Sequence, residues 1–375
     1  MPENWDVVVV GGGPAGAAAA LGALRARPDA RVLILDAARF PRDKVCGDGV
    51  APQALDVLAG LGIRADELVA GCAPVRRLRL RSPGGVVAVR DTERPGFVVP
   101  RLIFDDRLVR AAVAAGAGLR RHSVRSVTVA DDAVTVDREI RARVLIGADG
   151  SESVVRRQIG LAGPRSGTVA LAIRGYAPVG PWPAAEQSLL MTAAHWPAYA
   201  WVFPIGDGRA NIGYGELLRG QPLSRRHLLD RLRALLPEAE VSGLRAHRLP
   251  LSTGRPECAH GRVLLAGDAA GLINPITGEG ICYAVLSGSL AGAAAVGPRP
   301  AADYRKLLRD KLSGHLRHTD VLARLGRFPA VLDAGIGAAR DSQRTFDTLV
   351  ELGLGAGKLT PHALVTVARA ALRGR

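Results

Sequence analysis

Apolar residues gather in a few uninterrupted runs, and these runs predict the first elements of the chain. Residues 7–10 are four valines, residues 17–27 are rich in alanine, and residues 32–35 form a second apolar run that ends on Asp36. Short apolar runs of this kind are typical of strands buried on both faces of a parallel sheet. The pattern therefore predicts a strand, helix and strand unit at residues 6–36.

Two later apolar runs resemble the first. Residues 144–148 end at Asp149, and residues 263–266 end just before Asp268. We expect both to be buried parallel strands, with helices starting near Pro52 and Arg101. Residues 280–298 are uncharged but are interrupted at the end by glycine and proline, which favours a buried core helix over a membrane span.

Elsewhere the pattern alternates between polar and apolar residues. Residues 76–81 alternate, turn at residues 82–85 and continue at 86–89, which predicts a hairpin. The same signals predict the remaining elements: strands near 119–129, 134–136, 170–176, 199–204 and 210–214, a helix around 228–236, and helices from Tyr304 to the end with breaks at Pro329, 353–357 and Pro361.

A glycine motif follows the first strand. Gly11, Gly13 and Gly16 have the spacing G-x-G-x-x-G. In a dinucleotide site the first glycine permits the tight turn, the second lets the backbone approach a pyrophosphate, and the third lets the helix pack closely. Asp36, twenty residues past Gly16, stands where a carboxylate accepts hydrogen bonds from a ribose. The motif predicts a dinucleotide site, and its spacing fits NAD as well as FAD.

Three junctions between a strand and a loop should meet if the buried strands are neighbours. These are the glycine motif, Asp149-Gly150 and Gly267-Asp268, and ligands of parallel sheets lie off this edge. The glycines before the 280–298 helix offer a second helix amino terminus to an anionic group. We expect Asp149 to hold backbone rather than to take part in chemistry.

Composition narrows the class of protein. The net charge is +15 with basic residues scattered along the chain, which favours anionic ligands or a membrane surface without choosing between them. The few aromatic residues form no stripe with basic ones, so we expect no nucleic-acid binding. Four cysteines form no C-x-x-C pair, and His315 and His318 are expected to be solvent-exposed, so no metal site is predicted. The start of the chain lacks a basic segment, which predicts a cytoplasmic protein.

Taken together, the motifs resemble the flavoprotein superfamily of p-hydroxybenzoate hydroxylase and, more closely, the geranylgeranyl reductase family. That family's Tyr-x-Trp-x-Phe-Pro, followed after eight residues by Gly-x-Gly, is matched by Tyr199, Trp201, Phe203 and Pro204 and then by residues 213–215. The loop at residues 46–49, Cys-Gly-Asp-Gly, and the Arg-x-x-Phe-Asp stretch at residues 101–105 also resemble the family's. The resemblance covers nearly the whole chain.

The resemblance implies an α/β fold with a Rossmann-like FAD-binding domain, an inserted antiparallel-sheet substrate-binding domain and a helical C-terminal region. We expect the first at residues 1–73, 101–167 and 255–300, the second at 74–100 and 168–254, and the third at 301–375. Besides the glycine motif, the family likeness implies FAD contacts by Ala15, Asp36, Cys46, Gly47, Gly49, Arg101, Val124, Asp268, Gly280 and Ile281.

The implied reaction is the reduction of carbon-carbon double bonds in an isoprenoid chain. Reduced flavin would deliver hydride from N5, and Cys46 or Tyr199 would supply the proton. Tyr199, Trp201 and Phe203 share one face of a strand, where they form either ordinary core or an apolar wall for a prenyl-lipid substrate. Asp48 is either a catalytic residue or a solvated loop charge, and Cys46 either relays a proton or only fills space beside the ring.

Only one dinucleotide motif is present, so the electron donor, NAD(P)H or a reduced carrier protein, should bind transiently. The first alternative function is a flavin monooxygenase or epoxidase. A flavin halogenase is a weaker alternative, because its Gly-Trp-x-Trp-x-Ile-Pro motif is replaced at residues 198–204 by Ala-Tyr-Ala-Trp-Val-Phe-Pro. Peripheral contact with the inner face of a membrane would suit a lipid substrate and the positive charge.

Overall fold

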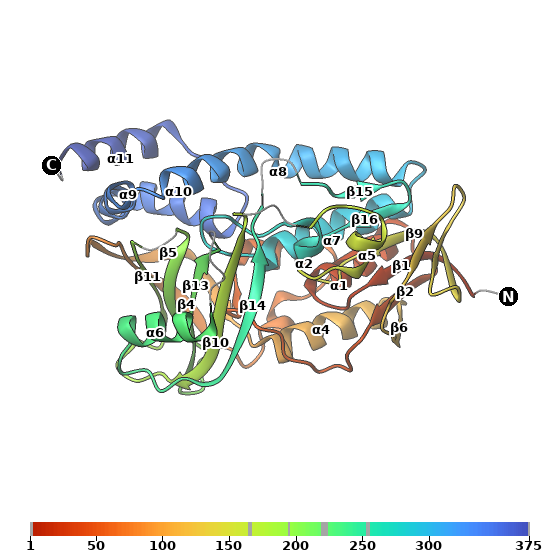
Figure 1. Ribbon diagram of the computed structural model, residues 1–375, viewed down its shortest axis with the longest axis horizontal. Coiled ribbons are helices and arrows are strands. Elements are labelled where there is room, and N and C mark those ends of the chain that lie inside the picture. Colours follow the sequence, from red (N-terminus) through yellow and green to blue (C-terminus); the bar gives the residue numbers. More distant parts are fainter. Residues whose placement is uncertain (1–2, 164–166, 194–195, 219–223, 253–255, 374–375) are drawn as a thin grey trace.

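A computed structural model describes residues 3–163, 167–193, 196–218, 224–252 and 256–373 of the chain. Two eight-stranded sheets lie at opposite ends of the molecule, and a group of C-terminal helices runs along one side of both (Figure 1). This arrangement confirms the predicted α/β fold. The predicted domain division stays a prediction that the two sheets support, and its boundary at 254/255 falls outside the described residues.

The first sheet has a parallel core built from the predicted apolar runs. β1 (Glu3–Val10) lies between β2 (Val32–Asp36) and β9 (Ile140–Gly147), so that Val7 pairs with Val32 on one side and Val144 on the other. β16 (Val263–Leu265) pairs parallel with β9, and β6 (Gly118–Arg121) with β2. The carboxyl ends of the central strands therefore meet at one edge, as predicted. The sheet is completed by β7 (Val127–Val129), β8 (Val134–Val136) and β15 (Ala259–His260).

One predicted strand is in fact two. The segment expected as a single strand at 119–129 divides into β6 and β7, which have different partners, since β6 extends the parallel core while β7 pairs antiparallel with β8. The intervening residues 122–126 carry His122 and Val124 to the edge where the strand ends meet, and both line the cavity described below.

The helices of the first domain pack through small residues. α1 (Pro14–Ala26) and α7 (Ile281–Ala295) cross so closely that a Cβ at Gly288 would overlap the carbonyl oxygen of Ala15. The residues of α7 are mostly buried, which confirms the predicted core helix. The remaining helical segments of this part are α2 (Pro52–Gly60), α3 (Ala65–Leu68), α4 (Arg101–Ala114), α5 (Val154–Gln158) and the 3₁₀ turn η1 (Gly267–Ala270).

The second sheet has the order β14-β10-β13-β12-β11-β4-β5-β3. It is antiparallel as predicted, except that β11 pairs parallel with β4. The predicted hairpin and strands are present as β4 (Pro74–Arg81), β5 (Val87–Val98), β10 (Val169–Pro178), β12 (Ala198–Pro204) and β13 (Arg209–Leu217), with α6 (Arg225–Leu235) nearby. Three strands of this sheet were not predicted: the two-residue β3 (Gly49–Val50), β11 (Glu186–Met191) and β14 (Ser242–Pro250).

The C-terminal region is helical, with the three predicted breaks and a further one at Ser342 that was not predicted. It contains α8 (Pro300–Leu325), α9 (Pro329–Asp341), α10 (Gln343–Leu354) and α11 (Pro361–Arg373). The expected exposure of His315 was wrong. Its side chain is fully buried, hydrogen-bonded to the Tyr283 hydroxyl through Nε2 and to the Gly357 carbonyl through Nδ1. His318 is partly buried, and its Nδ1 accepts from the Leu359 backbone N–H. The two histidines therefore tie α8 to the segment between α10 and α11.

Candidate active site

A cavity of about 1000 Å³ extends from the glycine motif to the C-terminal helices. Its walls come from the carboxyl edge of the first sheet, from one face of the second sheet, and from α8 to α11. Nearly every residue proposed from the sequence lines it: Gly11, Gly13, Ala15, Asp36, Cys46, Gly47, Gly49, Arg101, Val124, Tyr199, Trp201, Asp268, Gly280 and Ile281. Gly16 and Asp48 lie behind this surface.

The glycine motif has the local geometry that the spacing predicts. Gly11 has φ +99°, and a Cβ there would overlap the Ala148 carbonyl, while a Cβ at Gly16 would overlap the carbonyl of Gly11. Both positions therefore require glycine for turn and packing. Gly13 is different, because its Cα faces the cavity at the amino end of α1. The backbone at Gly13 and the amino terminus of α1 together form a cradle that is open to an anionic group.

Two arginines stand over this cradle. A Cβ at Gly13 would lie 3.5 Å from Nη2 of Arg42 and 3.7 Å from Nη2 of Arg101. Asp105 holds both, accepting from Arg101 at 2.6 and 2.7 Å and from Nη1 of Arg42 at 2.9 Å. Burial opposes the charge of Arg101, but the ion pair with Asp105 outweighs it and raises the Arg101 pKa. The sequence analysis did not propose Arg42, because it lies outside the glycine motif that ends at Asp36.

Asp36 lies beside the glycine motif at the end of β2. Its carboxylate accepts from the backbone N–H of Gly12 at 2.7 Å and of Ala38 at 2.8 Å. These bonds fix the carboxylate at the cavity wall, with Arg42 3.7 Å away. The position is the one expected of a ribose acceptor.

The loop that contains Cys46 and Asp48 is fixed by hydrogen bonds from side chains of the second sheet. Asp48 is fully buried with φ +61°, and it accepts from the Tyr176 hydroxyl at 2.6 Å and from Asn211 Nδ2 at 2.7 Å. The alternative that Asp48 is a solvated charge is therefore wrong. Burial raises the Asp48 pKa to about 6, although Arg174 and these hydrogen bonds act in the opposite direction. Arg174 itself donates to the Cys46 carbonyl at 3.0 Å, so the loop has a fixed backbone.

Three aromatic side chains of β12 form one wall of the cavity. The ring centroids of Tyr199 and Trp201 are 6.0 Å apart, and those of Trp201 and Phe203 are 6.4 Å apart. Trp201 Nε1 donates to Asn211 Oδ1 at 2.8 Å, and the Tyr199 hydroxyl donates to the Thr277 carbonyl. Gly213 lies behind Trp201, since a Cβ there would overlap the indole ring. The first glycine of the Gly-x-Gly motif thus makes room for Trp201.

The third junction brings Asp268 into the same cavity. Lys44 Nζ donates to Asp268 at 3.0 Å. Burial would raise the Asp268 pKa, but the charge of Lys44 and its hydrogen bond lower it below its ordinary value. Asp149 accepts from Ser153 Oγ at 2.6 Å and from the backbone N–H of Val154 at 2.7 Å, so it holds the backbone at the start of α5, as expected. Among the described residues, no group of three histidine, cysteine or acidic side chains is placed to hold a metal ion.

Fold and site together define an FAD-binding flavoprotein. The residues present fit the cofactor: a glycine loop with an open helix terminus, two arginines above it, an acceptor at Asp36, and a second helix terminus at Gly280 next to Asp268. A known family of proteins, the FAD binding domain, matches residues 4–289.

Relatives narrow the class further. Menaquinone reductase of Mycobacterium tuberculosis (strain ATCC 25618 / H37Rv) is 36% identical over 366 residues, which cover 88% of this chain and 86% of the relative. Digeranylgeranylglycerophospholipid reductase 1 of Methanopyrus kandleri is 35% identical over 346 residues, 86% of this chain and 89% of the relative. The chain belongs to the geranylgeranyl reductase family of FAD-dependent oxidoreductases.

Solved structures agree on the fold. A geranylgeranyl bacteriochlorophyll reductase-like protein from Thermoplasma acidophilum superposes with a TM-score of 0.81 at 23% identity, over 99% of this chain and 96% of that one. The flavin-dependent brominase Bmp2 has a TM-score of 0.76 at 18% identity, over 99% of each chain. The predicted family and the predicted FAD cofactor are therefore confirmed, whereas the contact each residue makes with FAD stays a prediction.

Proposed function

We propose that this enzyme reduces carbon-carbon double bonds in an isoprenoid chain. The observation that carries the proposal is the composition of the cavity away from the glycine motif. Beyond Tyr199 and Trp201, most of the lining side chains along α8 to α11 are aliphatic or small: Leu322, Leu325, Val331, Leu332, Ile336, Leu349, Val350, Leu352, Leu354, Leu359, Ala363, Leu364, Val367 and Ala368. Asp347 and Glu351 of α10 also line this part of the cavity. A mostly apolar path suits an extended hydrocarbon, because it removes much of the hydrocarbon surface from water and offers few polar partners.

When bound and reduced, FAD would supply hydride to one carbon of the double bond. The protein's own groups then orient the chain. Trp201 is fixed by Asn211 on one edge, and Tyr199 is fixed by Thr277, so the aromatic wall has little freedom to move. We propose that this wall holds the reacting double bond next to the loop containing Cys46, and that Asp48 positions that loop from behind.

The electron donor is proposed to be NAD(P)H or a reduced carrier protein that binds transiently. The support is the single glycine motif, which FAD itself would occupy. Anaerobic mixing of the oxidised protein with NADPH, NADH or reduced ferredoxin, followed by the flavin absorbance near 450 nm, would identify the donor. A donor that bleaches the flavin at a saturable rate supports the proposal.

The reaction is tested by anaerobic single turnover. The reduced protein is mixed with menaquinone and with geranylgeranyl-bearing lipids, and the products are weighed by mass spectrometry. We expect the gain of two hydrogens for each double bond and concurrent reoxidation of the flavin. A monooxygenase would instead require oxygen and add an oxygen atom to its product, and that result would overturn the proposal.

We also propose that the C-terminal helices dock on the surface of an anionic membrane on its cytoplasmic side. No helix among the described residues is long and apolar enough to span a bilayer. However, six of the eleven exposed large apolar side chains in the described part of the chain lie within residues 321–372: Val321, Leu325, Phe328, Leu364, Val365 and Leu372. Phe328 and Leu372 are 62% and 74% exposed.

Two observations support a lipid surface as the partner of these helices. Exposed arginines stand among the apolar side chains, at positions 317, 324, 327, 369 and 373, which matches an anionic bilayer. In addition, Leu325 and Leu364 belong both to the exposed group and to the cavity lining, so the apolar path reaches the surface here. A prenyl chain could then pass from the bilayer into the cavity without crossing water.

Vesicle sedimentation tests this docking surface. The wild type should bind phosphatidylglycerol vesicles more strongly than phosphatidylcholine vesicles, and less strongly in high salt. The double variant Phe328→Ser and Leu372→Ser should lose most of this binding, whereas Leu119→Ser and Val129→Ser, in exposed strands of the first sheet, should not. Equal binding by both double variants would contradict the assignment of this surface.

A further inference from the structure

We propose that Glu279 is the acid that protonates the substrate, and that the protein donates this proton through the Glu279 carboxyl group rather than through Cys46 or Tyr199. The inference rests on the proposed reduction of an isoprenoid double bond. Glu279 lines the cavity immediately before Gly280 and Ile281, where the family likeness implies flavin contact.

The turn that carries Glu279 is rigid. Asn274 Oδ1 accepts from the backbone N–H of Ile276 at 2.9 Å and of Thr277 at 3.3 Å, and Thr277 Oγ1 donates to the Gly353 carbonyl at 2.6 Å. Oε1 of Glu279 accepts from the backbone N–H of Cys282 at 2.8 Å. One carboxyl oxygen is therefore occupied by the first turn of α7, and the side chain has a defined orientation.

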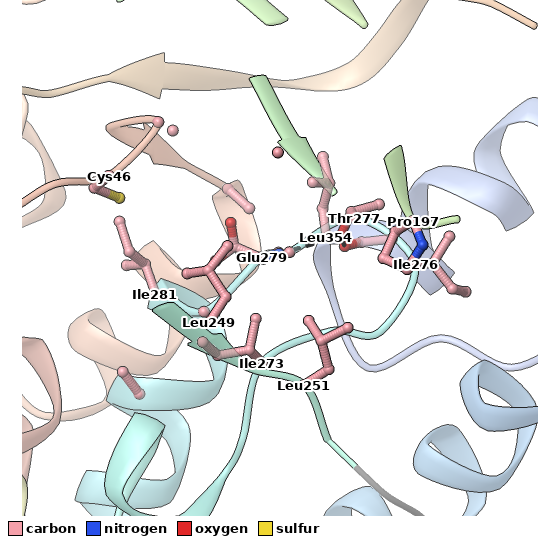
Figure 2. A pocket seen from close by; sticks show the side chains of 18 of the residues that line it. Cys46, Pro197, Leu249, Leu251, Ile273, Ile276, Thr277, Glu279, Ile281 and Leu354 are labelled. Atoms are coloured by element: carbon pink, nitrogen blue, oxygen red, sulfur yellow. Dashed lines mark hydrogen bonds between the residues drawn. The ribbon is translucent and has the colours of Figure 1, made fainter. Parts of the chain in front are cut away.

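The surroundings of the carboxyl group are largely apolar (Figure 2). In this view Glu279 lies between Cys46 and Ile281 on one side and Thr277 and Pro197 on the other. Leu249, Leu251 and Ile273, which belong to one apolar cluster, lie beneath it. Burial of this kind favours the neutral carboxylic acid over the charged carboxylate.

Burial raises the Glu279 pKa to about 7, against the hydrogen bonds from the start of α7 and the more distant charge of Arg101, which lower it. Glu279 therefore keeps its proton to a higher pH than an ordinary glutamate does, which suits a general acid that works near neutral pH. The charged and titratable groups around it are Arg101, Cys46, Tyr199, Cys282 and Tyr283; the charge of Glu279 raises the pKa of the last four.

Tyr199 and Cys46, which the sequence analysis proposed as proton donors, are less suited than Glu279 to protonate the substrate. Burial, and then the charges of Glu279 and Cys46, raise the pKa of Tyr199 well above its ordinary value, and its hydroxyl proton is already donated to the Thr277 carbonyl. Burial likewise raises the pKa of the Cys46 thiol. Of the cavity-lining acids near the aromatic wall, Glu279 is thus the one that can give up a proton most readily near pH 7.

In the proposed step, the double bond would gain a hydride at one carbon from reduced FAD and a proton at the other from the Glu279 carboxyl group. Two C–H bonds would form. The C=C π bond, the O–H bond of Glu279 and the N–H bond of reduced FAD that supplies the hydride would break, and the flavin would lose two electrons. Glu279 is left as a carboxylate, which water reprotonates before the next turnover.

Glu279→Gln removes the acidic proton while it changes the shape of the side chain little. Glutamine keeps the carbonyl oxygen that accepts from Cys282, so the start of α7 retains its hydrogen bond. We expect FAD to be retained and single-turnover reduction of a prenyl substrate to slow by about 10² to 10⁴-fold, the range for loss of a general acid. Glu279→Asp should recover part of the rate. Glu240→Gln, at an exposed glutamate outside the cavity, is the matched control and should match the wild type.

The pH dependence gives a second criterion. The wild-type rate should fall as pH rises through about 7, because the acid loses its proton, whereas Glu279→Gln should be slow and show no such fall. Wild-type rate and pH profile in Glu279→Gln would overturn the inference.

Infrared difference spectroscopy tests the protonation state without turnover. In the FAD-loaded proteins, subtraction of the Glu279→Gln spectrum from the wild-type spectrum should leave a carboxylic acid C=O band that disappears as pH is raised through about 7, whereas the band of Asp48, whose pKa is about 6, is common to both proteins and cancels. If the band is present but no prenyl substrate is reduced by the wild type, the proposed function fails while the neutral acid stands. If the band is equally present in both proteins, the assignment to Glu279 fails.

Discussion

Gly292 of α7 lies directly against Ala19 of α1, and a Cβ on Gly292 would overlap the Ala19 carbonyl oxygen. The same close approach recurs one turn away between Gly288 and Ala15, and in the opposite direction between Gly22 and Ser289. Both helices point their amino ends at the cavity, at Gly13 and at Gly280. The glycine contacts therefore fix the distance between the two helix termini that we expect FAD to span.

Gly292→Ala should destabilise the protein and loosen FAD together. The added methyl meets backbone atoms, which cannot rotate away, so the cost is expected to be about 3 kcal/mol. Thermal unfolding and the fraction of FAD retained on gel filtration measure the two effects. Gly337→Ala in α9 is the control, because nothing lies within 4 Å of its Cβ position, and it should be neutral or stabilising by up to about 1 kcal/mol.

Asp48→Ala should weaken both the fold and FAD binding, because the Tyr176 hydroxyl and the Asn211 amide lose their buried acceptor. Each unsatisfied donor costs about 1–3 kcal/mol. Asp48→Asn should be milder, since asparagine keeps an acceptor oxygen and tolerates the positive φ. Urea unfolding and FAD affinity check this. If Asp48→Asn abolished turnover with both quantities unchanged, Asp48 would instead act in the chemistry, as the sequence first suggested.

Tyr199→Phe and Cys46→Ala should each slow prenyl reduction by less than about 10-fold, below the range expected for loss of a general acid. Tyr199→Phe removes the hydrogen bond to Thr277 but keeps the aromatic ring beside Trp201. Single-turnover rates at pH 7 compare both with Glu279→Gln. A loss greater than 100-fold in either variant would return that residue to the role of proton donor.

The stability of the protein should depend on Glu279 with a definite sign. Its pKa is about 7 in the folded protein against an ordinary value of 4.5, so the unfolded state loses its proton at lower pH than the folded state. The wild type therefore loses unfolding free energy as pH rises from about 4.5 to about 7, by up to about 3 kcal/mol. Urea unfolding at pH 5 and pH 8 should show Glu279→Gln gaining on the wild type at the higher pH. A constant difference would contradict the raised pKa.

Local patterns were sufficient for much of this fold. The apolar runs around Val7 and Val144 specify buried strands without regard to distant residues, and the glycine spacing specifies a turn and a helix start. β11 was missed because its buried face carries Glu186 and Ser188, and Glu186 is neutralised by Arg79 from another strand. β14 was missed because it is an edge strand whose exposed Arg245 and Arg248 lie on opposite faces, so polar and apolar residues do not alternate along it.

The sequence predicted those site residues that belong to a recognisable motif, but not those whose surroundings come from distant segments. The burial of His315 depends on Tyr283 and Gly357, which no spacing around His315 reveals. Glu279 was missed for a similar reason. A glutamate before a helix resembles an ordinary first-turn acid, and its raised pKa comes from burial in the folded protein, where Leu249 and Leu251 from another segment lie near it (Figure 2).

The part of the cavity away from the glycine motif is lined mainly by the last helices of the chain, where its apolar path reaches the surface. Leu322, Ile336 and Val367 all belong to helices beyond residue 300, outside the segment that matches the FAD binding domain. Changes of side-chain size in these helices can therefore lengthen or shorten the space offered to a hydrocarbon while the cofactor cradle stays untouched. In this architecture chain-length selectivity and redox chemistry can diverge separately in evolution.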